Sequence, residues 1–346
     1  MVTLNDIAKA ARVSTNTVSR ALQADVAYRR PTFQKRAEHI RHLAEQMGYR
    51  PNASARAIRQ GSFNALTLLM STDPSRSELP KGMFYGIQAA ASGHGLAVHL
   101  NIVDDAQLES ESFVPDALRQ WHSDGLLVNY HKDPPERLYE LIQKYEVPAV
   151  WLNLDADSDC VRPDDFAVGQ AAARQMIDLG HRRVWYVGYS YKRDDFHYSE
   201  IDRRDGYIAA MRDAGLQPRA VDIYDRELGG LEWRLERWRE VFDTPDAPTA
   251  VIAYGAIGLT VVLDAAARRG VRVPDDLSIS TFSGSPIFHA GPVSTWLVPD
   301  YEVGRRGVEM LIRKITHPNE ANHSTKIEFS ISEEGSSVDR PSRPDS

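Results

Sequence analysis

The chain has 346 residues, of which 42% are hydrophobic and 26% are charged; this composition is typical of a folded globular protein and excludes disorder throughout. It contains no run of 18 apolar residues, and its first residues lack the apolar core of a signal peptide, so we expect a cytoplasmic protein that does not bind a membrane. The single cysteine, Cys160, excludes an internal disulfide and a cysteine-ligated zinc site, and we expect no metal or cofactor.

Charge is unevenly distributed along the chain. Residues 1–62 carry eleven Lys and Arg against four Asp and Glu, and the rest carries 30 against 44, which gives a net charge of −7. A small basic module ahead of a large acidic body is typical of a protein that binds a polyanion such as nucleic acid at one end. The alternative interpretation is an ordinary solvated basic surface.

Three short helices are predicted in the basic module. Apolar residues at helical spacing indicate a first helix over residues 4–11, with Thr3 as its N-cap. Ser14 is the expected N-cap of a second helix that ends at Leu22, and a third helix runs from about residue 32 to residue 47. Two short helices joined by a tight turn, with a third helix beside them, describe a helix-turn-helix module.

The second helix, within "VSTNTVSRAL", is unusually rich in hydroxyl and amide side chains. Ser, Thr and Asn compete with the helix backbone for hydrogen bonds and make a poor core helix. Val18, Ala21 and Leu22 lie on one face of it, so the polar residues share the opposite, exposed face. Something other than burial must favour them.

The segment "GYRPNASARAIRQG" follows the third helix. Pro51 interrupts the helical pattern, Asn52 can act as a cap, and residues 53–60 form a short helix that ends at Gly61. A helix of barely two turns is marginal in isolation. We therefore expect it to form only when something packs against it.

From Ala65 onward, β-type runs alternate with helical segments. This alternation is typical of parallel sheets built from βαβ units, and the number of strands and the Asp/Pro-rich break "NLDADSDCVRPDD" favour two α/β subdomains. The tail, residues 333–346, is expected to be disordered. The predicted strands are "ALTLLM", "LAVHLNIV", "GLLVNY", "PAVWLN", "RVWYVG", "AVDIY", "TAVIAY" and "LSISTF", and the helices include "GMFYGIQAAASGHG", "AVGQAAARQMIDLG", "RRDGYIAAMRDAG" and "LTVVLDAAARRG".

The chain resembles the LacI/GalR (lactose repressor) family of bacterial transcription regulators over nearly its whole length. "TLNDIAKAARVSTNTVSRAL" is similar to the family's DNA-reading signature, and "GYRPNASARAIRQG" is similar to its hinge helix. "LGHRRVWYVG", "RRDGYIAAMRDAGL", "PTAVIAY" and "RVPDDLSISTF" resemble successive landmarks of its effector-binding core. Several motifs in the right order at the right spacing make a specific match.

The resemblance implies an α/β fold: an N-terminal helix-turn-helix domain plus a periplasmic-binding-protein-like core of two parallel-sheet α/β subdomains, with the effector between them. It also implies a homodimer formed through the cores, and the absence of leucine from the tail favours a dimer over a tetramer. The expected divisions are residues 1–50 for the DNA-binding domain, 51–62 for the hinge, 63–332 for the core and 333–346 for the tail, with subdomains of approximately 63–157 plus 293–320 and 158–292 plus 321–332.

The same resemblance assigns residues to the contact with a palindromic DNA operator. Thr15, Asn16 and Arg20 occupy the positions that read base edges in the major groove, where an arginine can bind guanine through two hydrogen bonds. Ile58 matches a family leucine that wedges between base steps in the minor groove; a small contact between hinge and core is the alternative. The predicted DNA-binding residues are Thr3, Ser14, Thr15, Asn16, Thr17, Ser19, Arg20, Asn52, Ala55, Arg56, Ile58 and Arg59.

The effector site departs from the family pattern. The family presents an Asn-Asp pair and an Asp pair where this chain has Gly255-Ala256 and Ser283-Gly284, so carboxylates that would bind sugar hydroxyls are missing. The predicted effector-binding residues are Arg203 and Asp165, which match the family, together with Tyr254, Ser283 and Trp296. The expected effector is a small molecule such as a sugar, and its identity stays open.

Two features depart from the family pattern on the DNA side: Arg12, and the loop "QADVAYRRPTF" after the second helix, which is longer than usual and carries Arg29 and Arg30. Arg12 stands where the family has a glycine, so a left-handed backbone there costs roughly 1 kcal/mol. The extra arginines at this end predict a stronger salt dependence of DNA binding.

The sequence thus predicts a transcriptional repressor that is not an enzyme and that a small-molecule, carbohydrate-derived effector releases from its operator. An enzyme on the same α/β scaffold is the first alternative, but the chain has no nucleophile elbow, Walker loop, HExxH or complete GxGxxG motif. A soluble ligand-binding transport protein is the second, and it would need a signal peptide. Activation instead of repression also stays open, because operator position decides it.

Overall fold

The computed structural model describes residues 2–22, 31–49, 62–119, 123–190, 197–224, 238–288, 291–318, 320, 322–332 and 337–339. It divides into two compact units, Met1–Phe63 and Asn64–Ser346. Within these described ranges no helix is long and apolar enough to cross a membrane.

The N-terminal unit holds three helices around a small apolar core. They are α1 (Leu4–Ala11), α2 (Thr15–Leu22) and α3 (Pro31–Gln46), and they confirm the three helices predicted from the sequence. All three helices contribute to the core, and the Arg41 Nε of α3 donates to the Ala21 carbonyl of α2 over 2.8 Å. The buried core residues are Ile7, Ala8, Val18, Ala21, Ala37, Ile40 and Ala44.

Side chains satisfy the exposed N–H groups at the start of both short helices. The Thr3 hydroxyl accepts from the Asp6 N–H over 3.3 Å, and the Asp6 carboxylate accepts from the Thr3 N–H over 2.9 Å, which is a capping box. The Ser14 hydroxyl accepts from the Thr17 N–H over 3.2 Å. Both predicted N-caps are therefore confirmed.

The turn between α1 and α2 carries backbone strain. Arg12 has φ 53° and ψ 46°, a left-handed conformation in which its N–H bonds the carbonyls of Ala8 and Lys9. Glycine adopts this region without steric cost, whereas a residue with a Cβ does not. The predicted strain at this position is confirmed.

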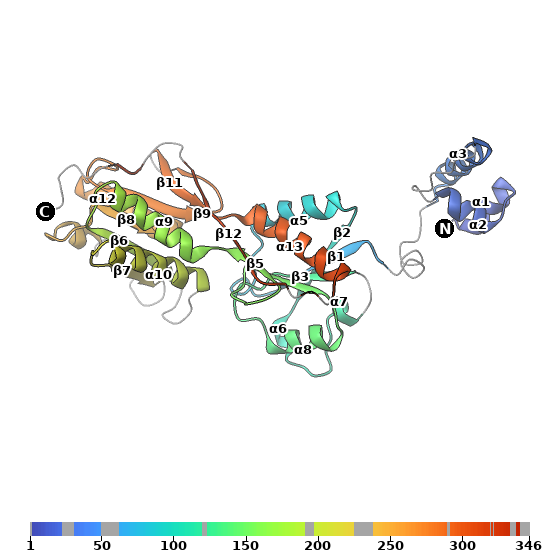
Figure 1. Ribbon diagram of the computed structural model, residues 1–346, viewed down its shortest axis with the longest axis horizontal. Helices are drawn as coiled ribbons and strands as arrows, with labels where there is room; N and C mark the ends of the chain where they lie inside the picture. The colour runs from blue at the N-terminus through green and yellow to red at the C-terminus, as the bar shows by residue number, and fades with distance from the viewer. Residues whose placement is uncertain are drawn as a thin grey trace. The chain divides into compact units, whose positions relative to one another are not determined.

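The first subdomain of the larger unit is built on a six-stranded, all-parallel sheet of order β12-β5-β4-β3-β1-β2. Helices α5 and α13 cover one face, and α6, α7 and α8 cover the other (Figure 1). Side chains of each strand alternate between these two apolar clusters. The elements are β1 (Ala65–Ser71), α5 (Lys81–Gly93), β2 (Ala97–Val103), α6 (Asp105–Leu108), α7 (Asp116–Arg119), β3 (Gly125–Val128), α8 (Glu136–Lys144), β4 (Ala149–Leu152), β5 (Cys160–Pro163), α13 (Asp300–Thr316) and β12 (Thr325–Ile327).

The second subdomain has the strand order β10-β11-β9-β8-β6-β7, with β13 paired to β11. Its central strands are parallel, and β10 and β13 run antiparallel to β11. Helices α9 and α10 pack on one face and α12 on the other (Figure 1). The elements are α9 (Asp165–Asp178), β6 (Val184–Ser190), α10 (Tyr198–Asp213), β7 (Arg219–Tyr224), β8 (Ala250–Ala253), α12 (Ala256–Arg269), β9 (Ser278–Ser283), β10 (Ile287–Phe288), β11 (Pro292–Leu297) and β13 (Ser330–Ser332).

The chain crosses between the subdomains later than the sequence predicts. Strand β5 lies in the first sheet beside β4, and β11 lies in the second sheet beside β9, so both expected boundaries fall too early. The segment "KIEFSI", expected in the second subdomain, is divided, because β12 joins the first sheet and β13 the second. The Asp/Pro-rich break misled the prediction, since it conceals the short buried strand "CVRP".

Close helix pairs fix the geometry of both subdomains. In the second, a Cβ on Gly169 of α9 would overlap the Arg203 carbonyl oxygen, and a Cβ on Gly206 of α10 would overlap the Phe166 carbonyl oxygen. Only glycine permits the two backbones to approach so closely. This contact places the start of α9, including Asp165, against the first half of α10.

Candidate functional site

Helix α2 presents the polar face that the sequence predicts. Val18 and Ala21 are buried against α1 and α3, whereas Thr15, Asn16 and Arg20 are exposed. Their side chains carry hydrogen-bond donors and acceptors that can reach base edges, on a helix of the size that the major groove admits.

Three of the predicted DNA-contacting hydroxyls already serve the local fold. The Thr3 hydroxyl donates to the Asp6 carboxylate over 2.7 Å, and the Ser14 and Thr17 hydroxyls lie 2.9 Å apart. Hydrogen bonds from the side chain and backbone of Thr3 hold the pKa of Asp6 below its usual range. The exposed Ser14 hydroxyl can still contact DNA while it caps the helix, because an oxygen has more than one lone pair. Ser19, on the same helix, is half-buried.

The predicted hinge residues lie outside the described residues. They are Asn52, Ala55, Arg56, Ile58 and Arg59.

A buried ion pair lies at the start of α9 and α10 in the second subdomain. The Arg203 Nε donates to Asp165 Oδ1 over 2.7 Å, and Asp165 is fully buried. Burial, the largest single cause, lowers the pKa of Arg203, but the Asp165 carboxylate together with the Tyr254 and Tyr186 side chains raises it by more, so the guanidinium stays charged. The sequence analysis assigned both residues to the effector site, and the structure brings them together.

Aromatic rings surround this arginine. The guanidinium carbon of Arg203 lies 5.0 Å from the centre of the Tyr254 ring, 4.8 Å from that of Phe282 and 5.2 Å from that of Phe329. Cation–π contacts of this kind gain strength where water is excluded. Arg203 therefore has one carboxylate partner, which accepts from its Nε, and three aromatic neighbours.

The first turn of α10 organises the neighbouring polar groups. His197 caps the helix, since its Nδ1 accepts from the Ser199 N–H over 3.2 Å. The Ser199 hydroxyl also lies 2.8 Å from the Tyr254 hydroxyl. Because His197 Nδ1 is an acceptor, the neutral ring carries its proton on Nε2.

Several contacts join the two subdomains next to this site. The Tyr198 hydroxyl donates to Asn153 Oδ1 over 2.7 Å. Arg162 of β5 pairs with Asp155 of the first subdomain at 2.9 Å and with Asp202 of the second at 3.0 Å. The boundary is therefore polar, and a change in the relative position of the subdomains must break or exchange these bonds.

His131 and His197 face each other across the same boundary. His131 follows β3 of the first subdomain, and the centres of the two rings lie 5.0 Å apart. Burial is the main cause that lowers the pKa of His131 to about 4 and that of His197 to about 3, so both rings are neutral at pH 7. Neither histidine was predicted as a site residue.

Trp296 and Ser283 complete the predicted effector residues. Trp296 lies beside Phe282 in the β9–β11 register and packs against the cluster that contains Tyr254, so it belongs with the Arg203 group. The Ser283 hydroxyl, at the end of β9, accepts from the Ser285 N–H over 3.3 Å in a local turn. No contact joins Ser283 to Arg203 or Asp165 among the described residues.

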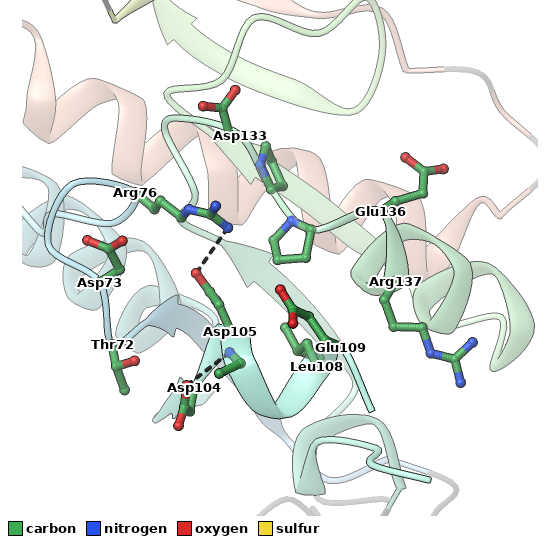
Figure 2. Close-up of a pocket in the computed structure, with 13 residues that line it drawn as sticks. Thr72, Asp73, Arg76, Asp104, Asp105, Leu108, Glu109, Asp133, Glu136 and Arg137 are labelled. Atoms are coloured by element: carbon green, nitrogen blue, oxygen red, sulfur yellow. Dashed lines mark hydrogen bonds and ion pairs between the residues drawn. The ribbon is translucent and has the colours of Figure 1, made fainter. Parts of the chain in front are cut away.

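A separate pocket of about 680 Å³ lies in the first subdomain, at the ends of β1 and β2 and before α8 (Figure 2). Asp105 lines this pocket, and three residues fix its carboxylate in place. The hydroxyls of Ser71 and Tyr130 donate to it over 2.8 and 2.6 Å, and Arg76 Nη1 lies 3.3 Å from its Oδ2. Burial and the Asp105 hydrogen bond raise the pKa of Tyr130. None of the predicted effector-binding residues lines this pocket.

Two family models match the chain. "Bacterial regulatory proteins, lacI family" matches residues 3–52, and "Periplasmic binding protein-like domain" matches residues 173–337.

The chain is similar over almost its full length to curated repressors. The ribose operon repressor of Escherichia coli (strain K12) is 27% identical over 350 residues, which covers 97% of this chain and 100% of that protein. The HTH-type transcriptional repressor CytR of the same strain is 26% identical, covering 90% and 89%. The HTH-type transcriptional repressor PurR of Mannheimia succiniciproducens is 24% identical, covering 94% and 96%.

Solved structures share the fold. A lac repressor dimer bound to operator and the anti-inducer ONPF matches with a TM-score of 0.75 at 18% identity, covering 97% of this chain and 99% of that one. A complex of the transcriptional regulator CelR with cellobiose matches with a TM-score of 0.60 at 21% identity, covering 97% and 100%. The predicted architecture, a helix-turn-helix domain followed by two α/β subdomains, is confirmed.

Proposed function

Because this chain belongs to the lacI family of bacterial regulatory proteins, we propose that it is a sequence-specific DNA-binding repressor that a small-molecule effector releases from its operator. It acts on DNA in the cytoplasm and needs no catalytic step. The polar face of α2 is the observation that carries this proposal.

Base readout is assigned to three exposed residues of α2. Thr15, Asn16 and Arg20 project from a helix whose opposite face is anchored by the buried Val18 and Ala21. Arg20 suits a two-bond contact to guanine, whereas the hydroxyls at the helix start suit phosphate oxygens. The basic charge of residues 1–62 supplies the attraction to the DNA backbone.

The hinge residues transmit the effector signal in this proposal. Ile58 wedges into the minor groove in this proposal, with Asn52, Ala55, Arg56 and Arg59 beside it; all five lie outside the described residues. The short helix that the sequence predicts over residues 53–60 is marginal in isolation, so a bias of a few kcal/mol from the core would decide whether it forms.

The effector site is assigned to the boundary around Arg203. Tyr254, Trp296 and the ion pair with Asp165 lie on the second subdomain, and His131 approaches from the first. A ligand bound there contacts both subdomains and shifts their relative position. The names of the relatives, which include a ribose repressor and a cellobiose-bound regulator, support a sugar or sugar-derived effector.

A homodimer formed through the cores completes the proposal. Strand β2 is an edge of the first sheet, and its Leu100 and Ile102 are more than half exposed, at 57% and 56%. Tyr85 of the adjoining α5 is exposed at 54%. An uncovered edge strand with large apolar side chains is a surface that a second copy can cover.

A gel-shift titration of the purified full chain with fragments of the source genome tests this function. We expect retention of particular fragments that weakens steeply between about 50 and 200 mM salt. Equal retention of all fragments, or none, overturns the proposal.

A further inference from the structure

Asp300 brings an unassigned carboxylate to the boundary between the subdomains. It is the first residue of α13 in the first subdomain, and a Cβ placed on Gly284 of the second would lie 2.8 Å from its Oδ2. The carboxylate thus occupies the space that the missing side chain of Gly284 leaves open. It has no hydrogen-bond or ion-pair partner within the part of the chain that the structure describes.

Asp300 faces charged groups from both subdomains. The Arg203 guanidinium lowers its pKa, whereas Glu78 and Asp165 raise it, and burial, the largest cause, brings the pKa to about 6. Arg203 forms its ion pair with Asp165 through Nε, and among the described residues no ion pair joins it to Asp300. At pH 7 the Asp300 carboxylate is therefore mostly ionised, and none of the described residues forms an ion pair with it.

Further buried polar atoms in the two subdomains lack hydrogen-bond partners among the described residues. Asn129 donates its amide to the Glu78 carbonyl over 2.8 Å, but its Oδ1 accepts nothing among the described residues. Both ring nitrogens of His131 and the indole Nε1 of Trp296 are also buried without a hydrogen-bond partner among the described residues. Leaving such groups unpaired is costly, so their concentration at one boundary points to a polar occupant.

The chemistry of these groups defines the occupant. A carboxylate and an amide oxygen accept, an indole N–H donates, and a neutral imidazole does both. A hydroxyl group satisfies each of them, because it donates one hydrogen bond and accepts others. Among the described residues of this boundary, Arg162 and Arg203 are already paired with carboxylates and Lys132 also has a partner, so a neutral group fits better than an anionic one.

We propose that Asp300 determines the specificity of the effector site, where it selects a neutral polyhydroxylated ligand over an anionic analogue of the same carbon skeleton. This rests on the proposed function, because it takes the boundary around Arg203 as the effector site. It also supplies a carboxylate to a site whose sequence lacks the expected ones at Gly255-Ala256 and Ser283-Gly284.

Isothermal titration calorimetry of the full chain without DNA tests the selection with matched probes. The pairs are D-ribose against D-ribose 5-phosphate, D-glucose against D-gluconate, and cellobiose against cellobionate. At least one neutral member binds, with an affinity about tenfold or more above that of its anionic partner. An anionic member that binds as tightly as its neutral partner, or a panel in which no neutral sugar binds, overturns the proposal.

Two variants locate the effect at Asp300. Asp300→Asn keeps the shape of the side chain and weakens binding of the neutral sugar by about tenfold or more. Gly284→Ala places a methyl group against the carboxylate and also weakens binding, whereas Gly93→Ala, which meets nothing within 4 Å, leaves the affinity unchanged. Wild-type affinity in Asp300→Asn overturns the proposal, and a thermal unfolding scan verifies that each variant is folded.

DNA binding by the same wild-type and variant proteins distinguishes the role of Asp300 from the repressor function. Selective retention of DNA together with failed sugar discrimination overturns only the role of Asp300. Sugar discrimination without selective DNA retention overturns only the repressor function.

Discussion

Arg203 Nε lies 2.7 Å from Asp165 Oδ1 inside the second subdomain, and both side chains are buried. The pair holds the starts of α9 and α10 together beneath the boundary with the first subdomain. It therefore supports the wall of the effector site that we propose at this boundary.

Removing one member of this pair exposes its structural role. Arg203→Met leaves Asp165 charged and buried without its partner, which we expect to lower the free energy of unfolding by about 3–5 kcal/mol in urea titrations. The double variant Arg203→Met/Asp165→Asn removes the unpaired charge as well, so its loss is smaller than that of Arg203→Met alone. A double variant that loses as much as the sum of the two single variants contradicts this assignment.

Arg20 is predicted to carry sequence selectivity. Arg20→Ala loses roughly 1 to 3 kcal/mol of discrimination between a selected operator and the same duplex with its guanines replaced, as measured by fluorescence anisotropy. Arg36→Ala, at an exposed position of α3, is the charge-matched control, and it weakens both duplexes equally. Undiminished discrimination in Arg20→Ala argues against base readout by this residue.

The strained turn at Arg12 is predicted to respond to glycine. Arg12→Gly removes the left-handed strain and stabilises the α1–α2 module by about 1 kcal/mol, so its amides exchange about fivefold more slowly in hydrogen-exchange mass spectrometry. Lys9→Gly, within helix α1, has the opposite effect because glycine weakens a helix interior. Faster exchange in Arg12→Gly is incompatible with strain at this position.

Acid is predicted to destabilise the protein through the two facing histidines. Their pKa values are lowered to about 4 for His131 and about 3 for His197, mainly by burial and further by neighbouring cations, which include Lys132 for both rings and Arg203 for His197. Their stabilising contribution is present above about pH 6.5, the value for an unfolded chain, and is lost as the pH falls towards 4. From pH 7 to 5, His131 alone accounts for about 2 kcal/mol.

The contribution of Asp300 to stability depends on pH in the opposite direction, so it serves as an internal control. Its pKa is raised to about 6, so its contribution is present below about pH 4 and is lost as the pH rises through 6. Asp300→Asn is therefore more stable than the wild type at pH 7.5 by about 1–3 kcal/mol.

Urea titrations at pH 7.5 and 5 test the histidines. The free energy of unfolding falls less between these pH values in His131→Gln than in the wild type. Equal pH profiles for the two proteins would contradict the role of the histidine pair.

Hydrophobic periodicity and capping were sufficient to predict most of the fold. The caps Thr3 and Ser14 and the apolar spacing of the short helices located the first module, and the apolar runs located eight strands. The short helices α6, α7 and α8 were not predicted, and the strand that contains Cys160 was taken as a break, because a short strand with an arginine and a proline carries no clear periodicity.

The proposed effector site was predicted only in part. The family resemblance pointed to Arg203 and Asp165. His131 and His197 lie far apart in the sequence and meet only when the subdomains pack, and Asp300 of the first subdomain likewise comes near Arg203 only through that packing. A histidine after a strand or an aspartate at a helix start is common, so neither residue alone gives a signal. The glycine at position 284 was interpreted as a missing carboxylate, whereas it leaves room for that of Asp300.

Selection from a randomised duplex library by the purified full chain tests whether α2 reads an operator sequence. If α2 reads an operator as part of a homodimer, sequencing yields one inverted repeat, and the Arg20→Ala protein enriches that repeat weakly or not at all. Enrichment of no motif by the wild-type protein, or enrichment of the same motif by Arg20→Ala to the same degree, would contradict the account.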